Sequence, residues 1–149
     1  MSKTQQVSVS RQIAAPPAVI FDIIADPTRH AEMDGSGTVQ RSKDDPSRLK
    51  LGDRFGMKMR FGFVPYDIRS TVVEYEENRL IAWAHFGKHR WRYELEPNDE
   101  GTLVTETFDW STSVAPWAIE AMGYPKQHVP SMEKTLERLE ELAVAEKSS

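Results

Sequence analysis

The stretch that decides the fold is DRFGMKMRFGF, which runs from Asp53 to Phe63. Large apolar residues alternate in it with basic residues and glycine. An alternation with a period of two gives a β-strand one apolar face and one face in water. The apolar face is unusually bulky here, so the strand must cover something large. Met57 and Met59 suit an irregular core or an adaptable ligand surface, because thioether side chains are flexible, and core filler is the simpler interpretation.

The composition is typical of one soluble globular domain, here spanning residues 1–149, with 39% hydrophobic and 28% charged residues. The net charge of −4 argues against a general nucleic-acid-binding protein, which normally carries a basic face. The absence of cysteine excludes disulfides and thiolate chemistry. No apolar run has the length of a signal-peptide core or a membrane span. We therefore expect a cytoplasmic protein with no membrane span.

Turn signals recur at regular spacing between residues 35 and 111, which predicts antiparallel strands joined by hairpins. A first strand around residues 7–13 precedes them, and proline stops it. The strands expected after it are Thr38 to Lys43, Gly52 to Phe63, Tyr66 to Glu76, Arg79 to Phe86, His89 to Glu96 and Thr102 to Ser111. The sequence therefore predicts seven strands.

Basic residues recur on the predicted outward strand faces and raise the question of a basic patch. The simpler interpretation is a solvated sheet face balanced by Glu94 and Glu96. The residues concerned are Arg54, Lys58, Arg60, Lys88, Arg90 and Arg92.

Three helices are predicted. Pro16-Pro17 can open a short helix with an apolar face up to Ile24, and Asp26-Pro27 can cap a second one that reaches Met33. A C-terminal helix is predicted from an apolar stripe at steps of three and four, namely Val129, Met132, Leu136, Leu139 and Ala143. This stripe also suits a coiled-coil dimer, but packing onto the sheet is favoured because the apolar strand face needs a cover. The segment from Val114 to Pro130 is interpreted as a kinked lid or helix entry, with a plain connection as the alternative.

This order predicts an α+β fold, in which a seven-stranded curved antiparallel sheet (β-α-α-β6-α, helix-grip) wraps around the long C-terminal helix. The chain resembles the START/birch-pollen-allergen-like superfamily (SRPBCC), and within it the polyketide cyclase/dehydrase family. The phrases that carry the resemblance are Ile13 to Asp22, Arg79 to Trp83, Trp91 to Pro97, Gly101 to Thr105 and the leucine-rich final helix. The resemblance is specific for the fold and weak for function.

The resemblance implies a cavity between the sheet and the C-terminal helix. Strand alternation and the segment before that helix suggest which side chains line it, although a one-residue bulge would reverse any strand. The candidate ligand-binding residues are Phe55, Met57, Met59, Phe61, Phe63, Trp83, His85, Trp91, Tyr93, Glu106, Phe108, Trp110, Trp117, Met122, His128 and Met132. For any single aromatic residue, ordinary core packing is the simpler interpretation.

His85 and Glu106 do not belong in a dry core, because a buried imidazole or carboxylate needs a polar partner, water or a ligand. Both are candidate catalytic residues for proton transfer. The alternative for His85 is a solvated histidine near the turn at Gly87. The alternative for Glu106 is that Thr105, Thr107 and Asp109 face inward instead.

Other chemistry has no visible basis in the sequence. No glycine-rich phosphate loop occurs, the four histidines lack metal-ligand spacing, and no serine sits in a nucleophile context. We therefore expect no cofactor and no metal.

The favoured function is binding of a small hydrophobic or aromatic molecule, such as a lipid or polyketide-like metabolite, by a monomer or homodimer. His85, Tyr93 and Glu106 would orient its polar end. One alternative, implied by the resemblance, is an aromatase/cyclase or dehydrase acting on a polyketide-like substrate. Another is a protein-interaction module, similar to co-chaperones or toxins of this fold, with the acidic face between Glu133 and Glu146 as its contact surface.

Overall fold

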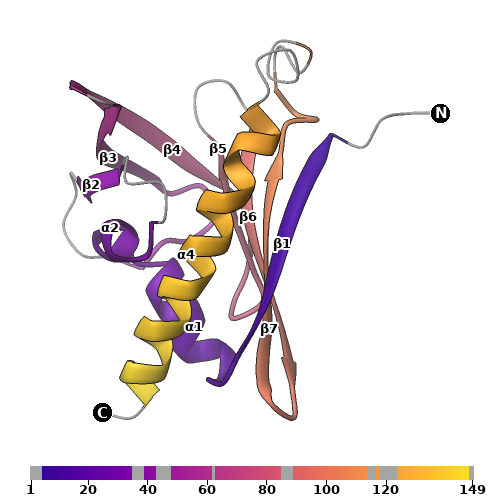
Figure 1. The fold of residues 1–149 in the computed structure, drawn as a ribbon. Coiled ribbons are helices and arrows are strands. Elements are labelled where there is room, and N and C mark those ends of the chain that lie inside the picture. The colour runs from indigo at the N-terminus through magenta and orange to yellow at the C-terminus, as the bar shows by residue number, and fades with distance from the viewer. Residues whose placement is uncertain are drawn as a thin grey trace.

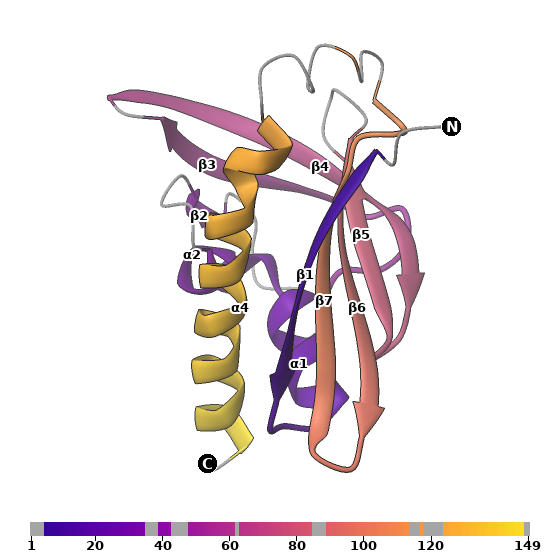
Figure 2. The same cartoon turned by 45° about the vertical axis from the view of Figure 1, so that its right-hand side comes forward.

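The computed structural model describes residues 5–34, 39–42, 48–61, 63–84, 89–113, 117 and 124–147, and for 39–42, 61 and 124–127 the backbone alone. Within these ranges, one antiparallel sheet of seven strands has the order β1-β7-β6-β5-β4-β3-β2. The strands are β1 (Gln6–Ile13), β2 (Val39–Ser42), β3 (Arg54–Phe61), β4 (Val64–Glu76), β5 (Leu80–Ala84), β6 (Arg90–Asn98) and β7 (Gly101–Asp109). The sheet curves strongly, and the β3–β4 hairpin reaches beyond the other strands (Figures 1 and 2).

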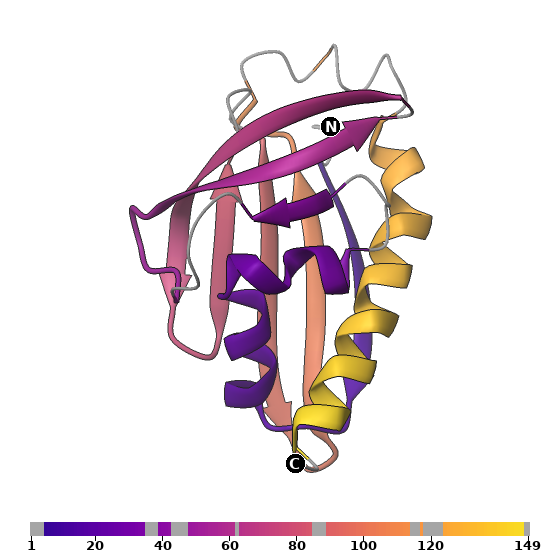
Figure 3. The ribbon, with the colours of Figure 1, turned by 90° about the vertical axis from the view of Figure 1, so that its left-hand side faces the viewer.

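The helices lie on the concave side of the sheet (Figure 3). They are α1 (Pro17–Ile24), the short 3-10 helix η1 (Pro27–Arg29), α2 (His30–Met33) and α4 (Tyr124–Lys147). The predicted cap is confirmed, because Asp26 accepts hydrogen bonds from the Thr28 amide at 3.0 Å and from the Thr28 hydroxyl at 2.6 Å. The seven-stranded curved sheet with the helices on its concave side confirms the predicted α+β helix-grip fold.

Helix α4 closes the concave side and packs chiefly against β1, α1, α2 and β7. Its predicted apolar stripe is buried at Met132, Leu136, Leu139 and Ala143. An ion pair of 2.8 Å joins Arg11 on β1 to Glu140. The stripe therefore packs on the chain's own sheet, as predicted.

Helix α4 begins earlier than the predicted apolar stripe, inside the segment that ends at Pro130. Residues Tyr124 to Pro130 are already helical, which agrees with the helix-entry interpretation of that part of the segment. A proline removes one helical hydrogen bond, and the turns packed after it outweigh that loss. Of the rest of the expected lid, the structure describes residue 117 alone.

The β3–β4 hairpin also departs from the prediction. Strand β3 ends at Phe61, which pairs with Val64, so Phe63 lies in the hairpin loop and not on an inner strand face. Its side chain is fully exposed. The alternation that buries Phe55 and Met57 ends in solvent, because the hairpin tip extends past the core that the other strands enclose (Figure 2).

Candidate functional site

A buried carboxyl and a buried phenol form the polar centre of the concave face. Glu106 on β7 and Tyr93 on β6 are direct cross-strand partners, so their side chains point to the same side of the sheet. Tyr93 donates its hydroxyl proton to Glu106 Oε2 over 3.0 Å. Glu106 is only 3% exposed.

The second oxygen of this carboxyl, Oε1, is also buried and has no hydrogen-bond partner in the part of the chain that the structure describes. Burial raises the pKa of Glu106 to about 8, against a weaker lowering effect of the Tyr93 hydrogen bond. Burial likewise raises the pKa of Tyr93 well above its usual value. At neutral pH the carboxyl is therefore largely protonated. Because Oε2 already accepts from Tyr93, the acid proton belongs on Oε1, where it is a donor without an acceptor among the residues that the structure describes.

The alternative strand phase, with Thr107 and Asp109 facing inward, is wrong. Both side chains lie on the convex face, where Thr107 hydrogen-bonds Ser8 at 2.8 Å and Asp109 accepts from Arg92 at 3.2 Å. They are nevertheless buried, because neighbouring side chains cover them. Arg92 also forms hydrogen bonds of 2.9 and 2.7 Å with Glu74, so Glu74 and Asp109 balance its charge, and not Glu94 and Glu96 as expected.

An aromatic wall separates the polar pair from helix α2. Trp83 lies 5.6 Å from Tyr93, between ring centroids, and stacks on His30 at 4.9 Å. His30 Nε2 donates to the carbonyl oxygen of Ile24 at 2.8 Å. Burial lowers the pKa of His30, so it is a neutral core residue. Sequence analysis does not single out His30, since nothing local shows that α2 folds into the concave face.

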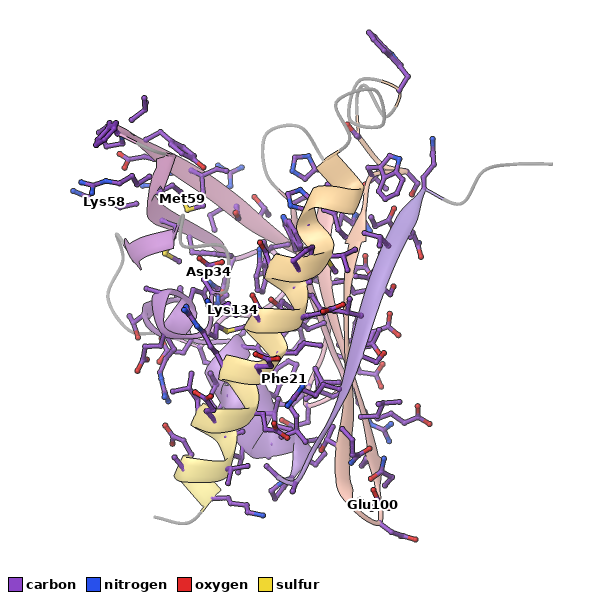
Figure 4. The ribbon with its side chains drawn as sticks, viewed as in Figure 1. Phe21, Asp34, Lys58, Met59, Glu100 and Lys134 are labelled. Carbon is purple, nitrogen blue, oxygen red and sulfur yellow. The ribbon has the colours of Figure 1, made fainter. Side chains whose placement is uncertain are left out.

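A second carboxyl, Asp34, ends α2 near the same space. It is partly buried, and Arg138 of α4 donates a hydrogen bond to its backbone carbonyl oxygen. Its negative charge contributes to raising the pKa values of Glu106, Tyr93 and Tyr66. In the view of Figure 4, Asp34 projects between Met59 of β3 and Lys134 of α4. Sequence reasoning missed Asp34, because only the fold brings α2 to this position.

Comparison with known proteins assigns the family. The family described as "Polyketide cyclase / dehydrase and lipid transport" matches residues 4–144. The chain belongs to this family. The family resemblance expected from the sequence is therefore confirmed.

Two proteins of Mycobacterium tuberculosis, both named as uncharacterized, are related in sequence. Rv0088 of strain H37Rv is 41% identical over 139 residues, which cover 90% of this chain and 62% of that protein. The corresponding protein of strain CDC 1551, MT0096, is 40% identical with the same coverage. The chain thus spans about three-fifths of the length of these relatives.

Solved structures of low sequence identity share the fold of this family member. Protein NE0264 from Nitrosomonas europaea is 17% identical with a TM-score of 0.78, and the match covers 100% of both chains. An AHSA1-like protein from Aeromonas hydrophila is 20% identical with a TM-score of 0.65, over 97% of this chain and 95% of that one. These likenesses concern the fold alone.

Most of the residues predicted to line the ligand cavity are inside the structure. Phe55, Met57, Trp83, Tyr93, Glu106, Phe108, Trp110 and Met132 are buried, and Met59, Trp91 and His128 are partly buried. Phe63 and Trp117 do not face inward as predicted, for Phe63 is fully exposed and Trp117 is 73% exposed. His85, Met122 and the side chain of Phe61 lie outside the described residues.

The inward residues fall into two groups. One surrounds the Glu106–Tyr93 pair, and the other gathers where α4 begins. In the second group, the His128 ring lies 5.0 Å from Trp91 and 4.7 Å from Phe108, and His89 lies 5.4 Å from Phe108. Burial lowers the pKa values of both histidines, and the charge of His89 further lowers that of His128.

Two hollows stand out on this member of the polyketide cyclase family. One, of about 330 Å³, lies between β1 and α4 beside Val9, Arg11 and Leu136. The other, of about 250 Å³, lies on the convex sheet face beside Arg79 and Leu103. Neither is lined by Glu106 or Tyr93, which are both buried.

Two further features concern ions and membranes. Among the described residues, no group of three or more histidine, aspartate or glutamate side chains has an arrangement that could hold a metal ion. No helix within the described ranges combines the length and the apolar character that crossing a bilayer requires.

Proposed function

We propose that this chain binds a small neutral apolar molecule that carries a hydrogen-bond-accepting oxygen, between the curved sheet and α4. The observation that carries the proposal is the buried Oε1 atom of Glu106, which has no partner in the described residues. Leaving a buried polar atom unsatisfied costs roughly 1–3 kcal/mol. A ligand oxygen that accepts the proton from Oε1 would recover this free energy.

The charges near the site favour a neutral ligand. A ligand carboxylate beside Oε1 would experience the negative charge of Asp34, which also acts on Glu106. Like charges in a site of low dielectric constant repel strongly and oppose binding. A ketone or aldehyde oxygen accepts a hydrogen bond from Glu106 without adding a charge.

Room for the ligand would come from side chains that rearrange. Met57 and Met132 are buried and Met59 partly buried on the walls of the concave space, and methionine adopts alternative conformations at low cost. Apolar contact would supply most of the affinity, at roughly 25 cal/mol per Å² of apolar area buried. Glu106 would then determine which polar group the ligand carries, while apolar contact provides most of the binding free energy.

A binding experiment with matched probes tests this proposal. A long-chain methyl ketone and the fatty acid of the same length are titrated at neutral pH, with tryptophan fluorescence as the readout, because Trp83 lies beside Tyr93. We expect the ketone to bind and the fatty acid to bind more weakly. Equal binding of both, or binding of neither, would contradict the proposal.

Variants of Glu106 sharpen the test. Glu106→Gln keeps an N–H donor and should retain ketone binding, whereas Glu106→Met keeps the volume without a donor and should weaken it about tenfold. Glu141→Met on the exposed side of α4 serves as the matched control. Unchanged ketone affinity in Glu106→Met would remove Glu106 from ligand recognition.

An enzyme of the cyclase or dehydrase type is the second candidate. A pKa of about 8 lets Glu106 exchange a proton near neutral pH, as a general acid or base requires. If the ligand is also turned over, Glu106→Gln should bind it and fail to convert it. Turnover at the wild-type rate in Glu106→Gln would exclude proton transfer by this residue. The role predicted for His85 stays a prediction.

A further inference from the structure

The β3–β4 hairpin carries an exposed apolar tip. Phe63 in its loop is fully exposed, Val64 is 63% exposed and Tyr66 is 40% exposed. The hairpin extends beyond the other strands, so this tip stands away from the body of the molecule (Figures 1 and 2). Exposed apolar side chains clustered at a protruding point mark a surface that contacts something other than water.

The apolar strip continues inward along one face of the hairpin. Strand pairing places Met59 opposite Tyr66 and Met57 opposite Ile68 on the concave side. Exposure falls along this face from Val64, through Tyr66 and the partly buried Met59, to the buried Met57. The tip is therefore the outer end of an apolar strip that begins in the core.

The opposite face of the hairpin is basic. Between Arg54 and Arg69 there are four basic residues and one acidic residue, in a chain with a net charge of −4. Lys58, Arg60 and Arg69 are exposed and share the convex side, because Gly56, the partner of Arg69, is in phase with the other two. Within the described residues none of them belongs to an ion pair. Lys58 points away from the body of the protein in Figure 4.

We infer that the β3–β4 hairpin docks onto the surface of an anionic lipid bilayer. Phe63 and Val64 would enter the boundary between headgroups and acyl chains, where aromatic rings are favoured. Lys58, Arg60 and Arg69 lie behind the tip on the same hairpin and would meet the negative headgroups through their long side chains. A second protein copy fits less well, because a symmetric pair joined through the apolar tip would leave the basic face, on the opposite side of the hairpin, without an acidic surface to contact. This inference goes beyond ligand binding and does not depend on it.

Sedimentation with vesicles tests the inference. The full chain is mixed with vesicles of phosphatidylcholine alone, and of phosphatidylcholine with phosphatidylglycerol, at low and high salt. We expect binding to the anionic vesicles and a loss of binding as salt rises, because salt screens the attraction. Absence of binding to anionic vesicles at low salt would overturn the inference.

Variants at the tip separate insertion from simple charge attraction. Phe63→Ala should lower partitioning onto anionic vesicles about tenfold, and Phe63→Trp should retain it. The matched control is Leu51→Ala, since Leu51 is an exposed apolar residue, like Phe63, but precedes β3 at its far end. Equal losses in Phe63→Ala and Leu51→Ala would contradict a specific role for the tip.

Charge reversal tests the basic face. The pair Lys58→Glu and Arg60→Glu should reduce binding to anionic vesicles by about tenfold or more and leave binding to neutral vesicles unchanged. Glu106→Met should bind vesicles as the wild type does, which separates this inference from the proposed ligand site. Concentration-dependent dimerisation abolished by Phe63→Ala, without vesicle binding, would assign the tip to a contact between protein copies and overturn the lipid inference.

Discussion

Tyr93 donates a 3.0 Å hydrogen bond to Glu106 across adjacent strands, and it satisfies only one of the two buried carboxyl oxygens. Burial favours the neutral form of Glu106, so the two residues form a hydrogen-bonded pair that needs no neighbouring positive charge. Without a ligand, the unsatisfied Oε1 lowers the stability of the folded protein. A suitable ligand would supply the missing hydrogen-bond acceptor.

The first prediction concerns the stability of this pair. Tyr93→Phe leaves both carboxyl oxygens without a donor and should lower the free energy of unfolding by about 1–3 kcal/mol. Glu106→Met should change the free energy of unfolding little, because removing the unsatisfied Oε1 offsets the loss of the acceptor for the buried Tyr93 hydroxyl. In the Glu106→Met background, Tyr93→Phe should cost little, since it then removes an unpaired hydroxyl. Urea unfolding of the four proteins completes the double-mutant cycle, and additive effects would show that the two groups are not coupled.

The second prediction concerns the dependence of stability on pH. The pKa of Glu106 rises from 4.5 to about 8 on folding, so the folded state holds a proton that the unfolded state releases above pH 4.5. Stability should therefore fall as pH rises from about 5 to about 8, by up to about 1.4 kcal/mol per pH unit, and level off above that window. The measurement is the difference in unfolding free energy between wild type and Glu106→Gln, in which the contributions of other groups cancel. A difference independent of pH would show that Glu106 is ionised in the folded protein.

The third prediction concerns His30, which bonds the carbonyl oxygen of Ile24 and stacks on Trp83. His30→Leu should lower the unfolding free energy by about 1–3 kcal/mol, because the buried carbonyl loses its donor. Burial lowers the pKa of His30 from 6.5, so its contribution is present above pH 6.5 and is lost as pH falls below that value. The variant should therefore lose less stability than the wild type between pH 6.5 and 5. A parallel pH profile for both proteins would count against a buried neutral imidazole.

The fourth prediction compares two glycines with positive φ. Gly101 has a φ of +127°, and an added Cβ would lie 2.2 Å from the carbonyl oxygen of Ile13, which is backbone and cannot move away easily. Gly52 has a φ of +85°, and no atom lies within 4 Å of its added Cβ. Gly52→Ala should cost about 1–2 kcal/mol through backbone strain alone, and Gly101→Ala clearly more, about 3 kcal/mol or above. Thermal unfolding ranks the two variants, and the reverse order would contradict the close packing of β7 against the end of β1.

Local sequence patterns account for much of the fold. The alternation from Phe55 to Met59 gives an inner strand face, the Asp26 cap starts a helix, and the Met132 to Ala143 stripe packs on the sheet. Each of these depends on interactions between residues that are near in sequence or on a simple division into buried and exposed faces. Strand alternation predicts wrongly that Phe63 faces inward, because it does not show where a strand extends beyond the core that it covers.

The candidate site divides in the same way. Sequence alone placed Tyr93 on an apolar strand face through strand alternation, but it left open whether Glu106 or its neighbours Thr105, Thr107 and Asp109 face inward. Only the tertiary structure decided that Glu106 and Tyr93 meet, that Oε1 is left without a partner in the described residues, and that Asp34 from α2 adds its charge. Strand pairing and helix docking join residues far apart in the chain, and pKa values and unpaired atoms follow from those long-range contacts. The bulky strand β3 therefore marks the inner wall, while the docking of α2 and α4 defines the chemistry of the space inside it.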